Sequence, residues 1–156
     1  MVLVDNFGKL LAKVMRPPSN SISAKAVLID TGGIARTFDV WSPGASFWRS
    51  GSTRVQIGDG TTPVDKADFF IDNPFGVAPE NGLILSQLWG ITLEVTQAQT
   101  LISNLGGAGT VEEVGLFKIG KDISATDRTI MLARDIVPPS PFLAGQNVIT
   151  EHEFQI

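Results

Sequence analysis

Hydrophobic residues recur at two different spacings along this chain, and the spacing divides it into a short helical start and a long β-rich remainder. Near the N-terminus, apolar residues recur three or four positions apart, which predicts a helix with one apolar stripe. Asp5 or Asn6 can cap its first turn. Pro17-Pro18 end it, because proline has no amide hydrogen to donate. The stripe consists of Phe7, Leu10, Leu11 and Val14.

After this helix the spacing of apolar residues changes to two, which is typical of β-strands. The run 24–30 is mostly apolar and predicts a strand buried on both faces. Gly32-Gly33 mark a turn into a partner strand. The apolar residues that alternate with polar ones along that partner strand are Ile34, Phe38 and Val40.

Further strands are predicted where apolar and polar residues alternate again. The first of them is short and presents Arg54 and Gln56 on a solvent-exposed face. The second is the longest, and a bulge at Gly90 would divide it in two. The fourth ends where Pro138-Pro139 and Pro141 break it. These strands cover residues 53–57, 83–96, 111–119, 129–137 and 148–156.

One helix against about seven or eight strands predicts a mainly β fold. We expect an antiparallel, jelly-roll-like β-sandwich with one short N-terminal helix. A chain of 156 residues fits a single domain. Residues 1–18 are expected to form the helix, which packs on the domain or on a neighbouring subunit, and residues 19–156 the sandwich. The segment 65–81 has no clear assignment, apart from a candidate brief strand at Phe69-Phe70-Ile71.

Charge and composition narrow the classes of function. The formal net charge is −4 and the basic residues are scattered, which argues against binding of nucleic acid. The absence of cysteine excludes disulfides and thiolate metal sites. No apolar run reaches the ~18 residues that cross a bilayer, and the N-terminus makes a poor cleaved leader, so membrane insertion is not expected. A chain that is 43% hydrophobic and only 18% charged either covers apolar surface with partners or has an unusually large core.

Three patterns raise the question of chemistry. The segment 115–121 has the spacing of a phosphate-binding loop, but Asp122 stands where that motif needs Ser or Thr, so a strand ending in a turn is favoured. A group of four aspartates has two open interpretations, a calcium site or solvated carboxylates that cap loop amides, and the second is favoured. The single histidine, His152, completes neither a metal site nor a catalytic triad alone. The acidic group is Asp59, Asp65, Asp68 and Asp72.

Aromatic residues near one predicted loop suggest a contact surface. Trp41, Phe47 and Trp48 lie in or beside a loop rich in Ser, Gly and Pro, whereas Trp89 shares the apolar face of its strand and is expected in the core. Exposed aromatic residues of this kind more often anchor a protein interface than a sugar ring, and both readings stay open.

Four short motifs, taken in order, resemble small structural proteins of tailed bacteriophages, such as tail-fibre and baseplate-associated components. The opening helix is similar at Asn6, Gly8, Leu11 and Ala12. A Gly-Thr-Pro turn is similar over 57–63, with Asp68 after it. The central strand is similar over 113–117, and the closing hairpin over 132–139 and 144–156. The resemblance implies no catalytic residues, and the stretches 31–53 and 72–86 match nothing in it.

These observations together predict a non-enzymatic virion structural protein, a subunit of a phage-like tail, collar or fibre that acts through contacts between subunits. A glycan- or receptor-binding module and a capsid decoration protein are the alternatives. The expected partners are copies of the chain and other virion proteins, with host surface glycan as a further candidate, and the expected location is the virion, assembled in the host cytoplasm. No catalytic residue, metal or cofactor is assigned. The residues expected at interfaces are Phe7, Leu10, Leu11, Val14, Trp41, Phe47 and Trp48.

Overall fold

A computed structural model describes residues 2–15, 24–41, 53–75, 96–102, 107–146 and 148–154. Within these ranges only the backbone is described for residues 13–15, 24, 41, 53, 96–102 and 149–154.

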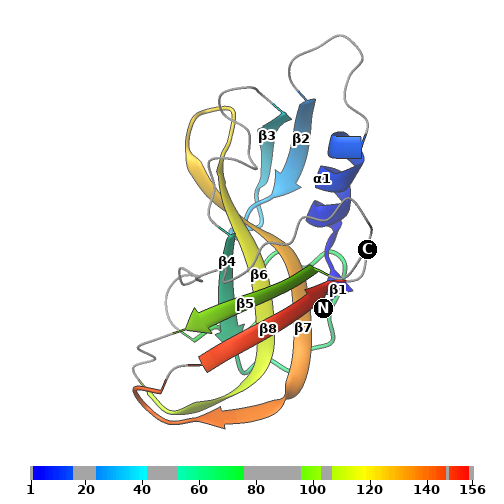
Figure 1. The fold of residues 1–156 in the computed structure, drawn as a ribbon. Helices are drawn as coiled ribbons and strands as arrows, with labels where there is room; N and C mark the ends of the chain where they lie inside the picture. The colour runs from blue at the N-terminus through cyan, green and yellow to red at the C-terminus, as the bar shows by residue number, and fades with distance from the viewer. Residues whose placement is uncertain are drawn as a thin grey trace.

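The described chain is mainly β, with antiparallel sheets and one short helix near the N-terminus (Figure 1). The sheets have four strands in the order β1-β7-β6-β4, two strands in β2-β3 and two strands in β5-β8. The elements are β1 (Val2–Leu3), α1 (Asp5–Met15), β2 (Ala24–Ile29), β3 (Ala35–Trp41), β4 (Thr53–Gly58), β5 (Thr96–Ile102), β6 (Gly109–Lys121), β7 (Asp127–Phe142) and β8 (Val148–Phe154).

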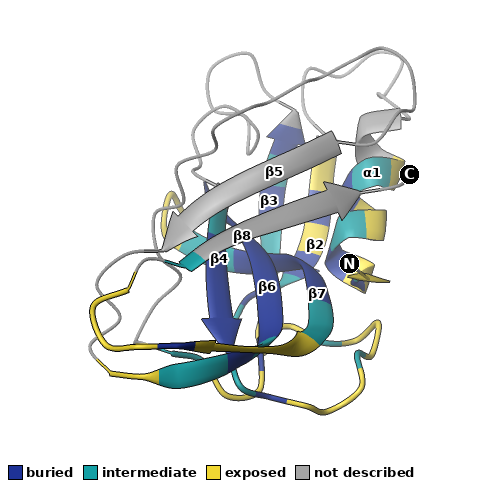
Figure 2. Cartoon of the chain, turned by 60° about the horizontal axis from the view of Figure 1, so that its bottom comes forward, coloured by how far each residue is buried: buried dark blue, intermediate teal, exposed yellow. Residues whose placement is uncertain are grey.

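The long hairpin of β6 and β7 forms the centre of the fold. β6 lies between β4 and β7, and its residues from 113 to 118 are all buried because neighbours cover both of its faces. Figure 2 shows this burial continuing into β4 and β7, whereas the turn after β7 and the segment 59–75 are mostly exposed. The main core joins apolar side chains from α1, β2, β3, β4, β6 and β7.

The hairpin β2-β3 is attached to the hairpin β6-β7 by two equivalent backbone bonds. The N–H of Thr31, the first residue of one turn, donates to the carbonyl of Thr129 at 3.0 Å. The N–H of Ile123, the first residue of the other turn, donates to the carbonyl of Thr37 at 2.9 Å. Each turn therefore binds the second strand of the other hairpin, and the two hairpins are related by a local pseudo-two-fold.

The same aspartate-centred turn closes both hairpins. Asp30 and Asp122 each accept backbone N–H bonds from residues two and four positions later, at 2.8–3.1 Å, and pair with an arginine six positions later at 3.0 Å. The donors are Gly32, Ile34 and Arg36 in the first turn and Ser124, Thr126 and Arg128 in the second. The repeat was not apparent from the sequence, because only the aspartate, the arginine and the threonine that follows it (Thr37 and Thr129) are shared.

These contacts keep both carboxylates charged. Burial alone raises the pKa of Asp30 and of Asp122, but the amide donors and the paired arginine outweigh burial and hold each pKa below its ordinary value. A lowered folded-state pKa stabilises the fold above the unfolded pKa of about 4, and this contribution is lost only as pH falls through the lowered value. Both turns are therefore expected to stay closed in mild acid.

The third residue of each turn has a left-handed backbone, and the two turns fill that position differently. Gly33 has φ +76° and Ala125 has φ +60°. We expect Ala125→Gly to raise the free energy of unfolding by about 0.5–1 kcal/mol. The left-handed region costs alanine about 1–2 kcal/mol, and glycine avoids this cost but loses part of the gain because its unfolded state has more conformational entropy. Gly33→Ala should lower it, since its Cβ would also lie 3.3 Å from the Phe69 ring. Urea denaturation measures both, and equal signs for the two substitutions would contradict the equivalence.

α1 is held against the sheets by a buried side chain instead of a capping one. The Asn6 side chain both donates to and accepts from the backbone of Ile29 in β2, at 2.8 Å each, and donates to the carbonyl of Met131 in β7 at 3.3 Å. The prediction that Asn6 caps the helix was therefore wrong. Asn6 instead links β2 to β7.

Several predicted strands differ in detail from the structure. β2 is half-buried, not buried on both faces, because Val27 is exposed between buried Ala26 and Leu28. Ile34 is also exposed, since it closes the turn. Gln56, expected in solvent, is buried.

The three prolines do not end β7. The strand continues through them to Phe142 and pairs with the start of β6, where Pro141 lies opposite Thr110. Pro138 and Pro139 lie where the register with β6 shifts, between the pairs Val111–Ser140 and Glu113–Ile136. On the other side, the described partner strand β1 reaches only residues 133 and 134.

One predicted strand covers a segment of which the structure describes almost nothing, and one observed strand was not predicted. The predicted strand 83–96, with Trp89, lies almost wholly outside the described residues. β5 was not predicted, because its segment Thr96–Ile102 carries no apolar alternation. It pairs along its whole length with β8, the predicted last strand, and Figure 1 shows the pair crossing β6 and β7.

Candidate functional site

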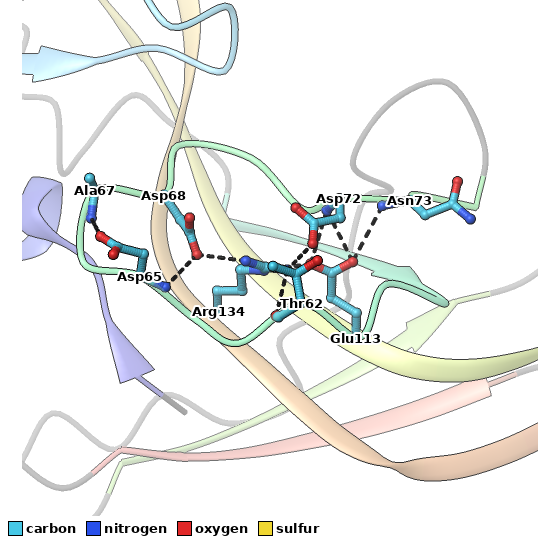
Figure 3. A network of polar contacts seen from close by, with 8 residues as sticks. All are labelled: Thr62, Asp65, Ala67, Asp68, Asp72, Asn73, Glu113 and Arg134. Carbon is cyan, nitrogen blue, oxygen red and sulfur yellow. Dashed lines mark hydrogen bonds and ion pairs between the residues drawn. The ribbon is translucent and has the colours of Figure 1, made fainter.

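A buried arginine organises the densest polar network among the described residues. Arg134 of β7 is 1% exposed, and its three guanidinium nitrogens each meet a different carboxylate. Nε lies 2.5 Å from Glu113, Nη1 lies 2.6 Å from Asp68 and Nη2 lies 2.7 Å from Asp72. Nη2 also donates to the carbonyl of Thr62 at 3.2 Å. Figure 3 shows the guanidinium held between the strands and the segment after β4.

Glu113 of β6 is the second centre of the network, and it is completely buried. Its carboxylate accepts the backbone N–H of Asp72 at 3.0 and 3.1 Å and that of Asn73 at 3.4 Å, besides the bond from Arg134. A buried carboxylate is stable when its oxygens are paired with donors in this way. Gly60 makes room for it, because a Cβ there would collide with the Glu113 carboxylate.

The network fixes residues 59–75, which we call the strap, against β6 and β7. The ends of the strap are joined to β4 and to each other by backbone bonds, from Asp59 N–H to Asn73 at 3.2 Å and from Phe75 N–H to Ile57 at 2.8 Å. Between these ends, the Asp5 N–H of α1 donates to the carbonyl of Lys66 at 2.8 Å. The described middle of the strap otherwise depends on side chains, above all on those around Arg134.

Opposing effects set the protonation of the arginine. Burial alone lowers the pKa of Arg134, but hydrogen bonds and charges from Asp68 and Glu113 outweigh burial and raise it. The guanidinium is therefore a permanent cation.

Three of the four short motifs singled out in the sequence meet in this network. The Gly-Thr-Pro turn contributes Gly60 and the Thr62 carbonyl, and Asp68 follows it. The central strand begins with Glu113, and the closing hairpin contains Arg134. Residues of these motifs are thus brought together by ion pairs and close packing, a connection that the sequence order alone did not reveal.

The acidic group singled out in the sequence is divided among local tasks. Asp68 and Asp72 bind the Arg134 guanidinium, so a fixed cation already lies between them. Asp65 accepts the N–H of Ala67 at 2.8 Å, and Asp59 accepts from the Asn73 amide. Asp68 also accepts the N–H of Asp65 at 2.9 Å. Three of the four therefore serve backbone or amide donors, as the favoured interpretation predicted. Among the described residues no cluster of three or more acidic or histidine side chains could hold a metal ion.

The other two candidate sites from the sequence are the segment 115–121 and His152. The segment 115–121 lies inside β6, so the prediction of a strand that ends in a turn is confirmed. Lys118 of this segment is buried, and burial lowers its pKa. His152 lies in β8, where its backbone pairs with Ala98 of β5, and its side chain lies outside the described residues.

The predicted interface residues fall into three groups. Leu10 is fully buried in the core of its own chain and is therefore not part of an outer surface. Phe7 and Leu11 are half-buried, and Phe7 packs against the same core. The side chains of Val14 and Trp41, and all of Phe47 and Trp48, lie outside the described residues.

An outer apolar row, not predicted as an interface, crosses the junction of the two hairpins. Val27 of β2 pairs with Thr37 of β3, and the Thr37 carbonyl accepts the N–H of Ile123. Val27 is 55% and Ile123 59% exposed. Alternation along β2 places Val27 opposite the buried residues, which is the sequence signal for this row.

Within the ranges that the structure describes, no helix combines the length and the apolarity needed to span a membrane. Comparisons of the chain with protein-family models, with curated proteins and with solved structures found no match.

Proposed function

We propose that the protein is a non-enzymatic structural subunit of a phage-like tail, collar or fibre assembly, which acts through contacts with copies of itself and with other virion proteins. The observation that carries this proposal is the network of Arg134. The residues that carry the resemblance to phage structural proteins converge there, and their charged groups bind one another and the backbone.

The use of charge elsewhere in the described chain supports the same role. The ion pairs of Asp30 and Asp122 close turns, as the ion pairs of Arg134 hold the strap. These carboxylates and guanidinium groups are thereby engaged in fixing the shape of the subunit. A rigid shape presents the same surface in every copy, which is what a symmetric assembly requires.

The outer apolar row formed by Val27, Thr37 and Ile123 is the contact surface that we propose. Covering exposed apolar side chains with a partner stabilises the complex, by about 1.5–3 kcal/mol for each large side chain that becomes fully buried. The proposed fold supports this use: we infer that β5 and β8 form the second layer of a sandwich over β6 and β7, since Val148 packs against the main core. The row would then lie on an outer face of the sandwich.

Sedimentation velocity over a range of protein concentrations tests the proposal. The unmodified protein should associate, and Val27→Asp and Ile123→Asp should each weaken association by about tenfold or more, because a charge would then be buried at the contact. Lys9→Asp on α1 is the control, since Lys9 is exposed and its replacement removes no apolar surface of the row.

A protein that remains monomeric at the high concentrations of an assembling particle would contradict the proposal. Association that is unaffected by both aspartate substitutions would leave the assembly role but exclude this surface. Binding to a glycan array by a monomer would instead support the receptor-binding alternative.

A further inference from the structure

The attachment of the strap to β6 and β7 depends mainly on charged side chains. Its middle part has few backbone bonds to the sheets, and its position depends on Asp68 and Asp72 binding Arg134 and on Glu113 accepting two strap amides. A backbone ladder does not change with pH, whereas a carboxylate loses its charge when it is protonated. The closure of this segment is therefore linked to proton uptake.

The strap covers a second apolar cluster. Ile71 of the strap is buried together with Val4, Phe117 and Met131, and the half-buried Phe70 ring lies 5.7 Å from that of Phe117. Movement of the strap away from β6 and β7 would expose this cluster without breaking the β6-β7 ladder. The main core uses other residues and stays covered.

We propose that the strap is an acid-sensitive clasp, which opens on proton uptake by the carboxylates around Arg134 and uncovers the apolar cluster beneath Ile71. The bonds of Glu113 in the closed state all come from donors, so a proton on this carboxylate finds no acceptor among them. A proton on Asp68 or Asp72 removes a charge-assisted bond that holds the strap to the guanidinium.

The charged groups around the clasp come from four places in the described chain. β7 contributes Arg134, β6 contributes Glu113, and the strap contributes the carboxylates already named. Beside them, Asp65 bonds strap amides and Asp59 bonds Asn73. At the start of α1, Asp5 binds Lys66 only through its backbone in the described contacts. Arg134 is the cation in contact with the three carboxylates, so loss of their charge leaves no other described ion pair to hold the strap.

Hydrogen exchange measured by mass spectrometry tests the clasp on the unmodified protein. After correction for intrinsic exchange, strap amides should exchange about tenfold faster or more at about pH 4 than at about pH 7, while β6 and β7 keep their protection. The turns at Asp30 and Asp122 are internal controls, because their carboxylates stay charged in mild acid. Equal protection of the strap at both pH values, or exchange that rises equally in strap, β6 and β7, would overturn the proposal.

Substitutions at neutral pH supply the second test. Glu113→Gln, Asp68→Asn and Asp72→Asn imitate the protonated state, and each should speed trypsin cleavage after the exposed Lys66 by about tenfold. Asp30→Asn makes the same change of charge outside the strap and should leave that cleavage unchanged. The partly exposed Asp68 and Asp72 keep the test valid if Glu113→Gln does not fold. Cleavage at the unmodified rate in both aspartate variants would refute the clasp. The readout is local, so it does not depend on the assembly role.

Discussion

Arg134→Met should be among the most destabilising substitutions in the described chain, with a loss of about 3–5 kcal/mol in the free energy of unfolding. The methionine fills much of the same volume but leaves the carboxylate of Glu113 completely buried without its cation. Removal of one partner of a buried ion pair costs more than the pair contributes, because the remaining charge is desolvated and uncompensated. Since domains have only about 5–15 kcal/mol of stability, this variant should be close to unfolding at room temperature.

Urea denaturation followed by tryptophan fluorescence measures the loss, and a second substitution tests its cause. If the buried charge is responsible, Glu113→Gln in the Arg134→Met background should recover part of the stability. Arg36→Met is the matched control, because the Arg36 side chain is 29% exposed and pairs with a single aspartate. It should cost no more than about 1 kcal/mol. A similar loss of stability in the Arg134→Met and Arg36→Met variants would show that burial of the Arg134 network does not account for the loss at Arg134.

Asn6→Leu is expected to have the second largest effect, with a loss of about 2–4 kcal/mol. The two side chains have similar volumes, but leucine leaves the Ile29 amide, the Ile29 carbonyl and the Met131 carbonyl without their bonds, and an unsatisfied buried group costs about 1–3 kcal/mol. Asn6→Asp should be at least as damaging, since a charged oxygen would face two carbonyl oxygens.

Thermal unfolding by circular dichroism compares these variants with Asn73→Ala, which removes the bond of an exposed asparagine side chain. The Asn73 variant should lose less than about 1 kcal/mol. An Asn6→Leu protein as stable as the Asn73→Ala protein would mean that water replaces the three bonds, and that the link between β2 and β7 is dispensable.

Periodicity was sufficient to predict the local elements in much of the described chain. The helix and the strands β2, β3, β4, β6 and β7 lie where apolar spacing placed them, because each contributes apolar side chains to the core and its sequence records their spacing. Errors arose where burial came from neighbours far along the chain. Gln56 is polar yet buried because β4 lies against β6. Pro138 and Pro139 of β7 lie where the register with β6 shifts and beyond the reach of β1.

The candidate site was less accessible from the sequence. Asp68, Glu113 and Arg134 were all in segments that the sequence had singled out, but no spacing rule connects residues so far apart in the chain. The acidic residues between 59 and 72 suggested a cation, and a cation is indeed present in the form of a guanidinium. Arg134 lies in the stretch 130–137, which is apolar apart from Arg134 and Asp135, and this was the available signal, since a charge is seldom buried without a partner.

The matched turns of the two hairpins have a consequence for how damage spreads. Because each turn donates a bond to the opposite hairpin, a lesion at Asp30 loosens the strand that contains Thr129, and a lesion at Asp122 loosens the strand that contains Thr37. The two turns make reciprocal contacts within one polypeptide, as equivalent surfaces do in a symmetric dimer. Each hairpin therefore contributes to the stability of the other through a single backbone bond at its turn.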